Sequence, residues 1–260
     1  LGFSPDMVWI KKRSSTGNHS LMDTVRGATK NLVPNDTQSE GTEAQYLNAF
    51  LSDGFSLGTS GVVNDGSSTY VAWGWDAGTT TESNTDGDIT SSVRTNASAG
   101  ISIVSWTGRN GTVGHGLNAK PGLIITKIRN SSSIWPVQHS AIGTNILQLE
   151  STGAAASDSS NRFNGTEATS SVFTAGTWWN SDSQGIAYCF APVEGFSAFG
   201  SYTGNGNVNG PFVYTGFRPR FVILRRTDSS GGDWRMFDTE RDTYNVSYQN
   251  LFGNNSDAEG

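Results

Sequence analysis

Cysteine is nearly absent from this chain of 260 residues, which contains only Cys189. A single cysteine cannot form an internal disulfide. Cys189 lies within the apolar run of residues 186–190, so the sequence predicts a small core residue rather than a reactive nucleophile. Long apolar runs are also absent, and no segment approaches the roughly 18 residues that a membrane-spanning helix requires. We therefore expect no helical membrane span.

Charged residues are scarce as well. Asp, Glu, Lys and Arg make up 15% of the chain, compared with roughly 25% in ordinary soluble domains. The formal net charge is −6, and the basic residues form no cluster. Because binding to a phosphate backbone depends on clustered Lys and Arg, we do not expect nucleic acid as a partner.

The sequence contains no recognisable catalytic motif. The three histidines, His19, His115 and His139, include no pair at a metal-binding spacing. A Gly-x-Ser-x-Gly nucleophile motif in a strand-to-helix context is absent. A glycosidase needs two carboxylates across a cleft, and the sequence alone pairs no two of its acids in this way. We therefore predict that the chain is not an enzyme, and a polysaccharide depolymerase is the third-ranked hypothesis.

Glycine and aromatic residues are abundant, with 32 Gly, 8 Trp, 7 Tyr and 13 Phe. Short β-branched or aromatic segments, such as residues 70–75, 101–106 and 185–190, are bounded by Gly or Pro. Long apolar patterns with a helical period are absent. Since aromatic rings bury a large area per residue, a few of them can stabilise short strands. The sequence predicts an all-β chain of tandem antiparallel β-sandwich modules of the jelly-roll or lectin-like type.

A segment with a Gly-apolar-x-Pro turn, an apolar strand and a basic residue occurs three times. The copies are residues 2–11, 116–127 and 216–225, and the second contains one extra residue. They are separated by about 100–115 residues, which is the size of a β-sandwich module. The sequence therefore predicts three related modules, with residues 123–127 and 221–225 forming equivalent buried strands.

An Asp-x-x-Arg pair follows the first and third copies of this segment. The pairs are Asp23 with Arg26 and Asp238 with Arg241. Repeats share architecture more readily than they share a binding site, so we interpret both pairs as structural ion pairs, with ligand binding as the alternative.

The repeat register divides the chain into four parts. Residues 1–78 form a β-sandwich repeat that lacks its first strands, and residues 79–88, rich in Thr, Gly and Asp, are predicted to be a linker. Residues 89–194 form a complete repeat, and residues 195–260 form a partial third repeat. The chain does not begin with Met, and we expect polypeptide from outside this window, in cis or from a neighbouring subunit, to complete both end modules. We also expect a homo-oligomer, as a trimer or a filament.

The order of several motifs resembles a repeat domain found in virion proteins of tailed bacteriophages, especially those of cyanobacteria and other aquatic bacteria. The motifs that carry this resemblance are residues 2–11, 23–27, 53–58, 70–73, 200–206, 210–213 and 216–219. The resemblance implies a concanavalin-like sandwich in a tail fibre or similar appendage, located at the virion surface beside other virion proteins. It implies no catalytic residues.

These observations lead to a ranked set of functions. The first is a non-enzymatic structural and adhesive module of a phage virion appendage, with host surface glycan as a candidate ligand. The alternative is a carbohydrate-binding module of a secreted bacterial adhesin or cell-surface filament.

Two adjacent tryptophans stand out in a polar segment, where Trp178 and Trp179 are followed by Asn180 and Asp182. Adjacent strand residues point to opposite faces, so one ring is expected in the core and the other at the surface. An exposed indole stacks on a sugar face, and nearby amides and carboxylates bond sugar hydroxyls. These four residues are the candidate carbohydrate-binding site. Subunit contact and capping of the sandwich edge are the alternatives for the exposed ring.

Asp86 and Asp88 are a candidate calcium site, because Ca²⁺ prefers oxygen ligands. Asp228 and Asp233 form a second acidic pair. An ordinary Asp-Gly-Asp turn explains the first pair equally well, and no EF-hand series of ligands follows it. We therefore expect no cofactor, with Ca²⁺ at Asp86 and Asp88 as the candidate exception.

Overall fold

The computed structural model describes residues 1–243 and 245–260. Strands account for 35% of the chain. The one helical element in these residues is a short 3-10 turn, η1 (Ser140–Ile142). The named strands pair only in the antiparallel sense throughout this described part. The prediction of an all-β fold is confirmed, and the antiparallel sheets are consistent with a β-sandwich.

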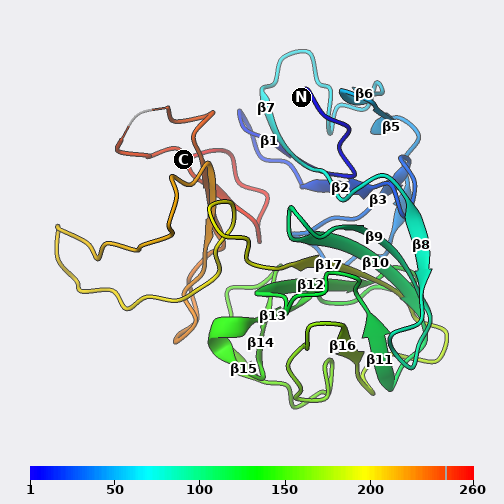
Figure 1. Ribbon diagram of the computed structural model, residues 1–260. Coiled ribbons are helices and arrows are strands. Elements are labelled where there is room, and N and C mark those ends of the chain that lie inside the picture. The colour runs from blue at the N-terminus through cyan, green and yellow to red at the C-terminus, as the bar shows by residue number, and fades with distance from the viewer. Residues whose placement is uncertain (244) are drawn as a thin grey trace.

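The largest sheet contains eight strands and forms the body of the molecule (Figure 1). Its spatial order is β15-β14-β13-β12-β17-β10-β9-β8. The central strands are rich in Ile, since branched side chains fit a sheet that is buried on both faces. The strands are β8 (Thr81–Asn84), β9 (Ser91–Asn96), β10 (Ile101–Thr107), β12 (Leu123–Ile128), β13 (Pro136–His139), β14 (Asn145–Gln148), β15 (Ala156–Ser157) and β17 (Gln184–Phe190).

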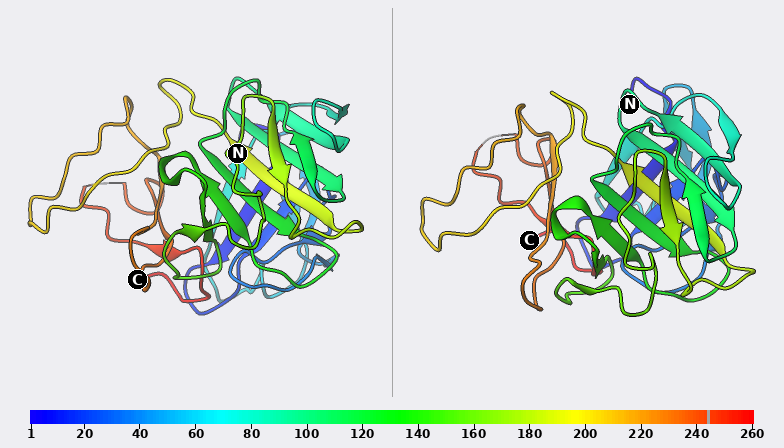
Figure 2. Two further views of the ribbon diagram at one scale, coloured as in Figure 1. Left: turned by 90° about the horizontal axis from the view of Figure 1, so that it is seen from below. Right: turned by 60° about the horizontal axis from the view of Figure 1, so that its bottom comes forward.

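Five smaller sheets complete the fold, with the orders β2-β1-β7, β18-β19-β20, β11-β16, β3-β4 and β5-β6. Figure 2 shows the last of the three-stranded sheets, coloured orange to red, standing beside the main body. The strands are β1 (Met7–Lys12), β2 (Ser20–Asp23), β3 (Lys30–Asn31), β4 (Gly41–Thr42), β5 (Leu47–Leu51), β6 (Gly54–Leu57), β7 (Tyr70–Trp75), β11 (Gly111–Gly114), β16 (Val172–Ala175), β18 (Phe221–Leu224), β19 (Arg235–Asp238) and β20 (Leu251–Phe252).

Side chains alternate between two hydrophobic clusters on the two faces of the eight-stranded sheet. Along β12, Leu123 and Ile125 face one cluster and Ile124 faces the other. Cys189 belongs to the second cluster, where burial raises the pKa of its thiol to about 12. The prediction that Cys189 is a core residue is confirmed.

The first of these clusters, which we call the shared core, is formed by all three predicted modules. Its tryptophans include Trp9 from the first module, Trp135 from the second and Trp234 from the third. The three modules therefore pack on one common core. The second module also encloses the second cluster, and the first encloses a smaller cluster of Val8, Ile10, Met22, Leu47 and Val63.

Three β-hairpins surround the shared core. The first hairpin is β1–β2, the second is β12–β13 and the third is β18–β19, and each is antiparallel. A leucine from the next segment lies beside the second strand of each hairpin: Leu32 by a bridge to Leu21, Leu147 in β14 and Leu251 in β20. These three leucines are all buried in the shared core, so the predicted repeat exists as three equivalent hairpins.

The segment of residues 79–88, predicted to be a linker, instead contains β8 (Thr81–Asn84). This strand forms the edge of the eight-stranded sheet, where it pairs with β9. The prediction of a linker is wrong because a short polar segment rich in Thr fits a solvated edge strand as well as it fits a turn.

The third module differs from the other two. β12 and β18 occupy equivalent places as predicted, but β12 is fully buried whereas all of β18 is only half-buried. Residues 198–220 contain no strand within the described chain, although residues 101–107 of the second module form β10. Figures 1 and 2 show this segment, coloured yellow to gold, as a long loop extending away from the sheets.

Candidate functional site

The three hairpins are joined in a closed ring by three loops. Loop 1 (residues 33–40) lies against the second hairpin, loop 2 (148–155) against the third, and loop 3 (252–259) against the first. In each case a backbone N–H near the loop end donates to the carbonyl that follows the hairpin's first strand. These bonds join Glu40 to Arg129 (2.8 Å), Ala155 to Thr227 (2.9 Å) and Glu259 to Arg13 (2.9 Å).

At the start of each hairpin's second strand, the N–H of an aromatic side chain, indole or imidazole, donates to backbone carbonyls at the start of the neighbouring loop. Trp135 Nε1 donates to the carbonyl oxygens of Val33 (3.1 Å) and Asp36 (3.0 Å) in loop 1. Trp234 Nε1 donates to the carbonyl of Gln148 in loop 2 (3.0 Å). Both indoles are buried, so each bond satisfies a polar group that water cannot reach.

His19 fills the same position in the first hairpin. Trp9 Nε1 donates to His19 Nδ1 at 2.7 Å, so the neutral imidazole carries its proton on Nε2. This nitrogen faces the carbonyl oxygens of Phe252 (3.0 Å) and Asn255 (3.1 Å) in loop 3. Complete burial, with a further contribution from nearby Lys11, lowers the pKa of His19 to about 3. His19 is therefore a structural residue held in its neutral form.

Two buried lysines bind the same loops through carbonyl oxygens. Lys127 Nζ donates to the carbonyl of Thr37 in loop 1 at 2.8 Å, and Lys11 Nζ donates to that of Asp257 in loop 3 at 2.7 Å. Burial lowers the pKa of each ammonium group to about 8. The repeated basic residue that ends the apolar run thus serves to anchor a loop of another module.

The Asp-x-x-Arg pairs lie at the centre of this ring. Arg26 Nε binds Asp23 Oδ2 at 2.6 Å, and both side chains are completely buried. Arg26 also reaches Glu40 at 3.2 Å, and Arg129 binds the same carboxylate at 2.8 Å. Burial raises the pKa of Glu40, but hydrogen bonds and positive charge from both arginines outweigh it and hold the pKa below its ordinary value.

The third hairpin and loop 3 repeat this network. Arg241 binds Asp238 at 2.6 Å and Glu259 at 2.7 Å, and Arg13 binds Glu259 at 2.6 Å. Trp73 Nε1 donates to Asp238 at 3.0 Å. The interpretation of both Asp-x-x-Arg pairs as structural ion pairs is confirmed, and each pair additionally joins two modules.

The structure separates the four candidate carbohydrate-binding residues. Trp179 is 1% exposed, and its ring centre lies 4.8 Å from that of Trp106. Its Nε1 donates to the carbonyl of Arg162. Trp178 is half-buried, with the Arg162 guanidinium 5.8 Å from its ring centre. Both tryptophans lie in a turn after β16 rather than in a strand. The expectation of one core ring and one outer ring still matches their burial.

Asn180 and Asp182 are both exposed near this turn. The Asn180 backbone N–H donates to Ser183 Oγ at 2.9 Å, and the Asp182 carbonyl accepts from the Asn130 amide at 3.0 Å. Both side chains therefore remain available to solvent beside Trp178, whereas Trp179 is withdrawn into the core.

Substitutions at the two tryptophans will differ in their effect on stability. We expect Trp179→Phe to lower the free energy of unfolding by roughly 1–3 kcal/mol, because the change removes a buried hydrogen bond and leaves a small void. Trp178→Ala is expected to cost less than about 1 kcal/mol. Urea unfolding monitored by circular dichroism checks both values, and equal losses would contradict the assigned burial.

The candidate calcium ligands are both exposed. Asp88 Oδ2 accepts from the Thr112 backbone (2.9 Å) and hydroxyl (2.8 Å), and Asp86 accepts from Asn84 (2.9 Å). The described residues contain no cluster of three or more His, Cys, Asp or Glu side chains suited to hold a metal. The two aspartates act as turn residues that attach the end of β8 to β11.

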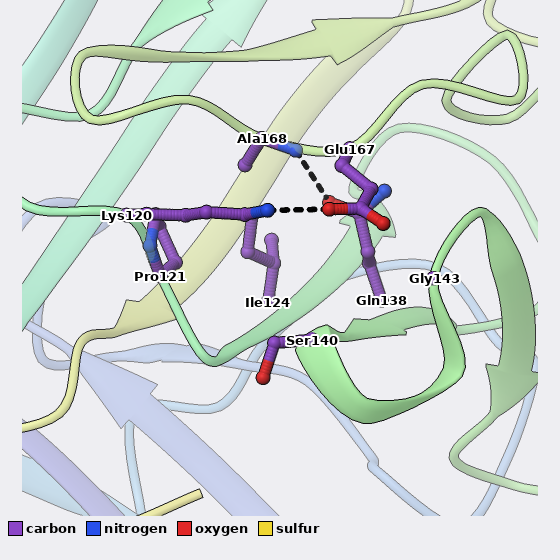
Figure 3. Close-up of a pocket in the computed structure, with 8 residues that line it drawn as sticks. All are labelled: Lys120, Pro121, Ile124, Gln138, Ser140, Gly143, Glu167 and Ala168. Atoms are coloured by element: carbon purple, nitrogen blue, oxygen red, sulfur yellow. Dashed lines mark hydrogen bonds and ion pairs between the residues drawn. The ribbon is translucent and has the colours of Figure 1, made fainter.

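One small cavity lies between β12, β13 and the segment before β16. Figure 3 shows Lys120 and Glu167 meeting in an ion pair across it, while the Ala168 backbone donates to Gln138 Oε1. The cavity measures about 10 Å³, which is room for about one water molecule. It is too small to hold a substrate.

A larger, open cavity of about 320 Å³ lies beside β2, β3 and the start of β5, and we call it the polar cavity. Ser20 is one of its lining residues, but the Ser20 Oγ is itself buried and has no hydrogen-bond partner in the described structure. Residues with amide, carboxylate, ammonium and aromatic side chains also line this cavity. They are Asn31, Gln38, Glu43, Lys12 and Tyr46. No sequence pattern indicates this site, because its walls come from segments that the fold brings together.

The whole chain, residues 1–260, matches the family model of a domain of unknown function, DUF7483, and the chain belongs to this family. No curated protein and no solved structure matches it. No helix in the described part of the chain is long and apolar enough to cross a membrane.

Proposed function

We propose that this chain is a non-enzymatic structural and adhesive module of a phage virion appendage, such as a tail fibre, that binds host surface glycan. The observation that carries the structural part is the closed ring of hairpins and loops. Arg26, Arg241 and Lys127 are charged groups that the fold buries, and each contacts another module. Arg26 donates to Tyr188, Arg241 lies over the ring of Trp73, and Lys127 donates to the carbonyl of Thr37. This use of buried charge supports a rigid body rather than a reactive centre.

The phage assignment is supported by the resemblance of the repeated motifs to virion proteins. Shared packing of three modules also suits an exposed appendage, because partial opening of one module exposes the core of all three. Electron microscopy with an antibody against the chain tests the location: labelling of tail fibres supports a virion protein, and labelling of bacterial filaments supports the alternative adhesin.

The polar cavity supports the adhesive part of the proposal. Sugar sites combine a few well-placed polar groups with an aromatic surface, and about 320 Å³ lies at the lower end of the size of ligand pockets. The exposed amides of Asn18 and Gln38 line this cavity and can bond sugar hydroxyls, while Tyr46 offers an aromatic face.

A glycan array followed by calorimetry tests this site. We expect one class of bacterial surface glycan to bind without release of reducing ends, and Tyr46→Ala to weaken binding at least tenfold. Trp178→Ala is the matched control at the site predicted from sequence, and it is expected to leave binding unchanged. If Trp178→Ala weakens binding and Tyr46→Ala does not, the glycan binds at Trp178 instead of the polar cavity. Turnover of the glycan would overturn the non-enzymatic assignment.

A further inference from the structure

The first strand of a hairpin is flanked by an additional strand in two of the three modules. β7 pairs with β1 and β17 pairs with β12, both antiparallel. The register is the same in both: Trp73 lies opposite Trp9, and Tyr188 lies opposite Ile125. We call β7 and β17 the flanking strands. The third hairpin has no flanking strand on β18 within the described residues, where β18 pairs only with β19.

The open edge of β18 can be assigned to particular backbone groups. The carbonyl of Arg220 accepts from the Thr239 N–H at 3.0 Å, which identifies this pair as hydrogen-bonded between the two strands. Bonding alternates along an antiparallel ladder, so Val222 and Leu224 bond to β19. The N–H and C=O groups of Phe221 and Ile223 therefore point to the open edge.

The surface beside this edge is apolar and incompletely covered. The side chains of Phe221 and Ile223 pack only partly on the shared core, and the whole strand is half-exposed. The loop of residues 198–220 also exposes Phe212 and Tyr214, to 89% and 82% of their area, but it extends away from the sheets (Figure 1). The incompletely covered apolar surface at this edge is therefore that of β18 itself.

Each flanking strand carries an aromatic hydrogen-bond donor that reaches another module. Tyr188 donates to Asp23 at 2.7 Å, and Trp73 Nε1 donates to Asp238 at 3.0 Å. In the second hairpin, the residue equivalent to these aspartates is His139. Its Nδ1 accepts from the Ala141 N–H at 3.0 Å, so the neutral ring carries its proton on Nε2. His139 is half-buried, and its Nε2–H can donate to a tyrosine hydroxyl but not to an indole.

We propose that the open edge of β18 accepts a strand from a partner polypeptide other than a second copy of this chain. The strand is antiparallel and apolar, of the β7/β17 type, with a tyrosine opposite Ile223. The occupant bonds to the free backbone groups of Phe221 and Ile223, and its tyrosine hydroxyl accepts from His139 Nε2. The equivalence of the three hairpins fixes both the direction and the register of this strand. The β18 edge is thus an interaction surface that does not depend on glycan binding.

A synthetic peptide with the β17 sequence, residues 184–190 with Cys189→Ser, is the probe. We expect saturable binding that slows hydrogen exchange at the Phe221 and Ile223 amides at least tenfold, read by NMR on the full chain. Replacing Tyr188 by Ala in the peptide is expected to weaken binding about tenfold.

The control is the same peptide methylated at the Ile186 and Tyr188 nitrogens. Gln184 accepts from Arg129, so alternation places these two amides on the side of β17 that bonds to β12. The methylated peptide is expected not to bind, and the protein needs no substitution. Equal binding of both peptides, or no protection by the parent peptide, overturns the proposal. Protection that rises with protein concentration alone assigns the edge to a second copy and also overturns it.

Discussion

Arg26→Ala is expected to lower the free energy of unfolding by roughly 3–5 kcal/mol, because removing one member of a buried ion pair leaves the other charge buried without its partner. The Arg26 side chain is completely buried and lies 2.6 Å from Asp23. It also donates to Glu40 in loop 1 and to Tyr188 in β17. Its loss therefore weakens contacts between the first and second modules together with the first hairpin. Chemical denaturation at neutral pH measures the change.

Arg226→Ala is the matched control. Arg226 binds Asp228 at 2.7 Å, a distance close to that of the buried pair, but both side chains are largely exposed. Exposed pairs contribute little, so the control is expected to leave the free energy of unfolding nearly unchanged. If the two variants lose equal stability, Arg26 does not hold the modules together.

Acid is expected to destabilise the protein through His19. The imidazole has an ordinary pKa near 6.5 when the chain is unfolded, and burial lowers the pKa to about 3 in the folded protein. Between these values the unfolded chain binds the extra proton and the folded protein does not. The free energy of unfolding therefore falls as the pH decreases from 6.5 towards 3, by about 1.4 kcal/mol per pH unit from this residue.

His19→Gln isolates this contribution. Glutamine keeps an amide donor close to the carbonyls of loop 3 and does not titrate, so the variant is less stable at pH 7 but loses less stability on acidification. Parallel urea titrations of both proteins between pH 7 and pH 4 compare the two slopes. Identical slopes would show that His19 is not held neutral by burial.

The amino-acid sequence determined the fold class and the repeat. Short apolar runs led by Pro5, Pro121 and Pro219 fix where each hairpin begins, because proline and glycine end one element and apolar alternation starts the next. The Asp-x-x-Arg spacing likewise fixed a local feature, since the aspartate also accepts from the arginine backbone three residues later. These features are local, so they can be predicted from neighbouring residues.

Only the tertiary structure shows how the three repeats contact one another. Nothing in the spacing of Glu40 and Arg129, or of Glu259 and Arg13, indicates that loops of one module bind the hairpin of another. The linker prediction at residues 79–88 failed for a related reason, because whether a polar segment becomes an edge strand depends on whether a neighbouring strand lies beside it.

For the candidate sites too, the sequence indicates some features and only the tertiary structure shows the others. Polar context identified Trp178 and Trp179, but only packing against Trp106 shows that Trp179 is withdrawn into the core. The polar cavity combines Ser20 with Tyr46 from a different strand region, and burial alone leaves the Ser20 hydroxyl without a partner. Composition and local pattern thus specify strands and turns, whereas cavities, open edges and buried charge networks arise from contacts between residues distant in the chain.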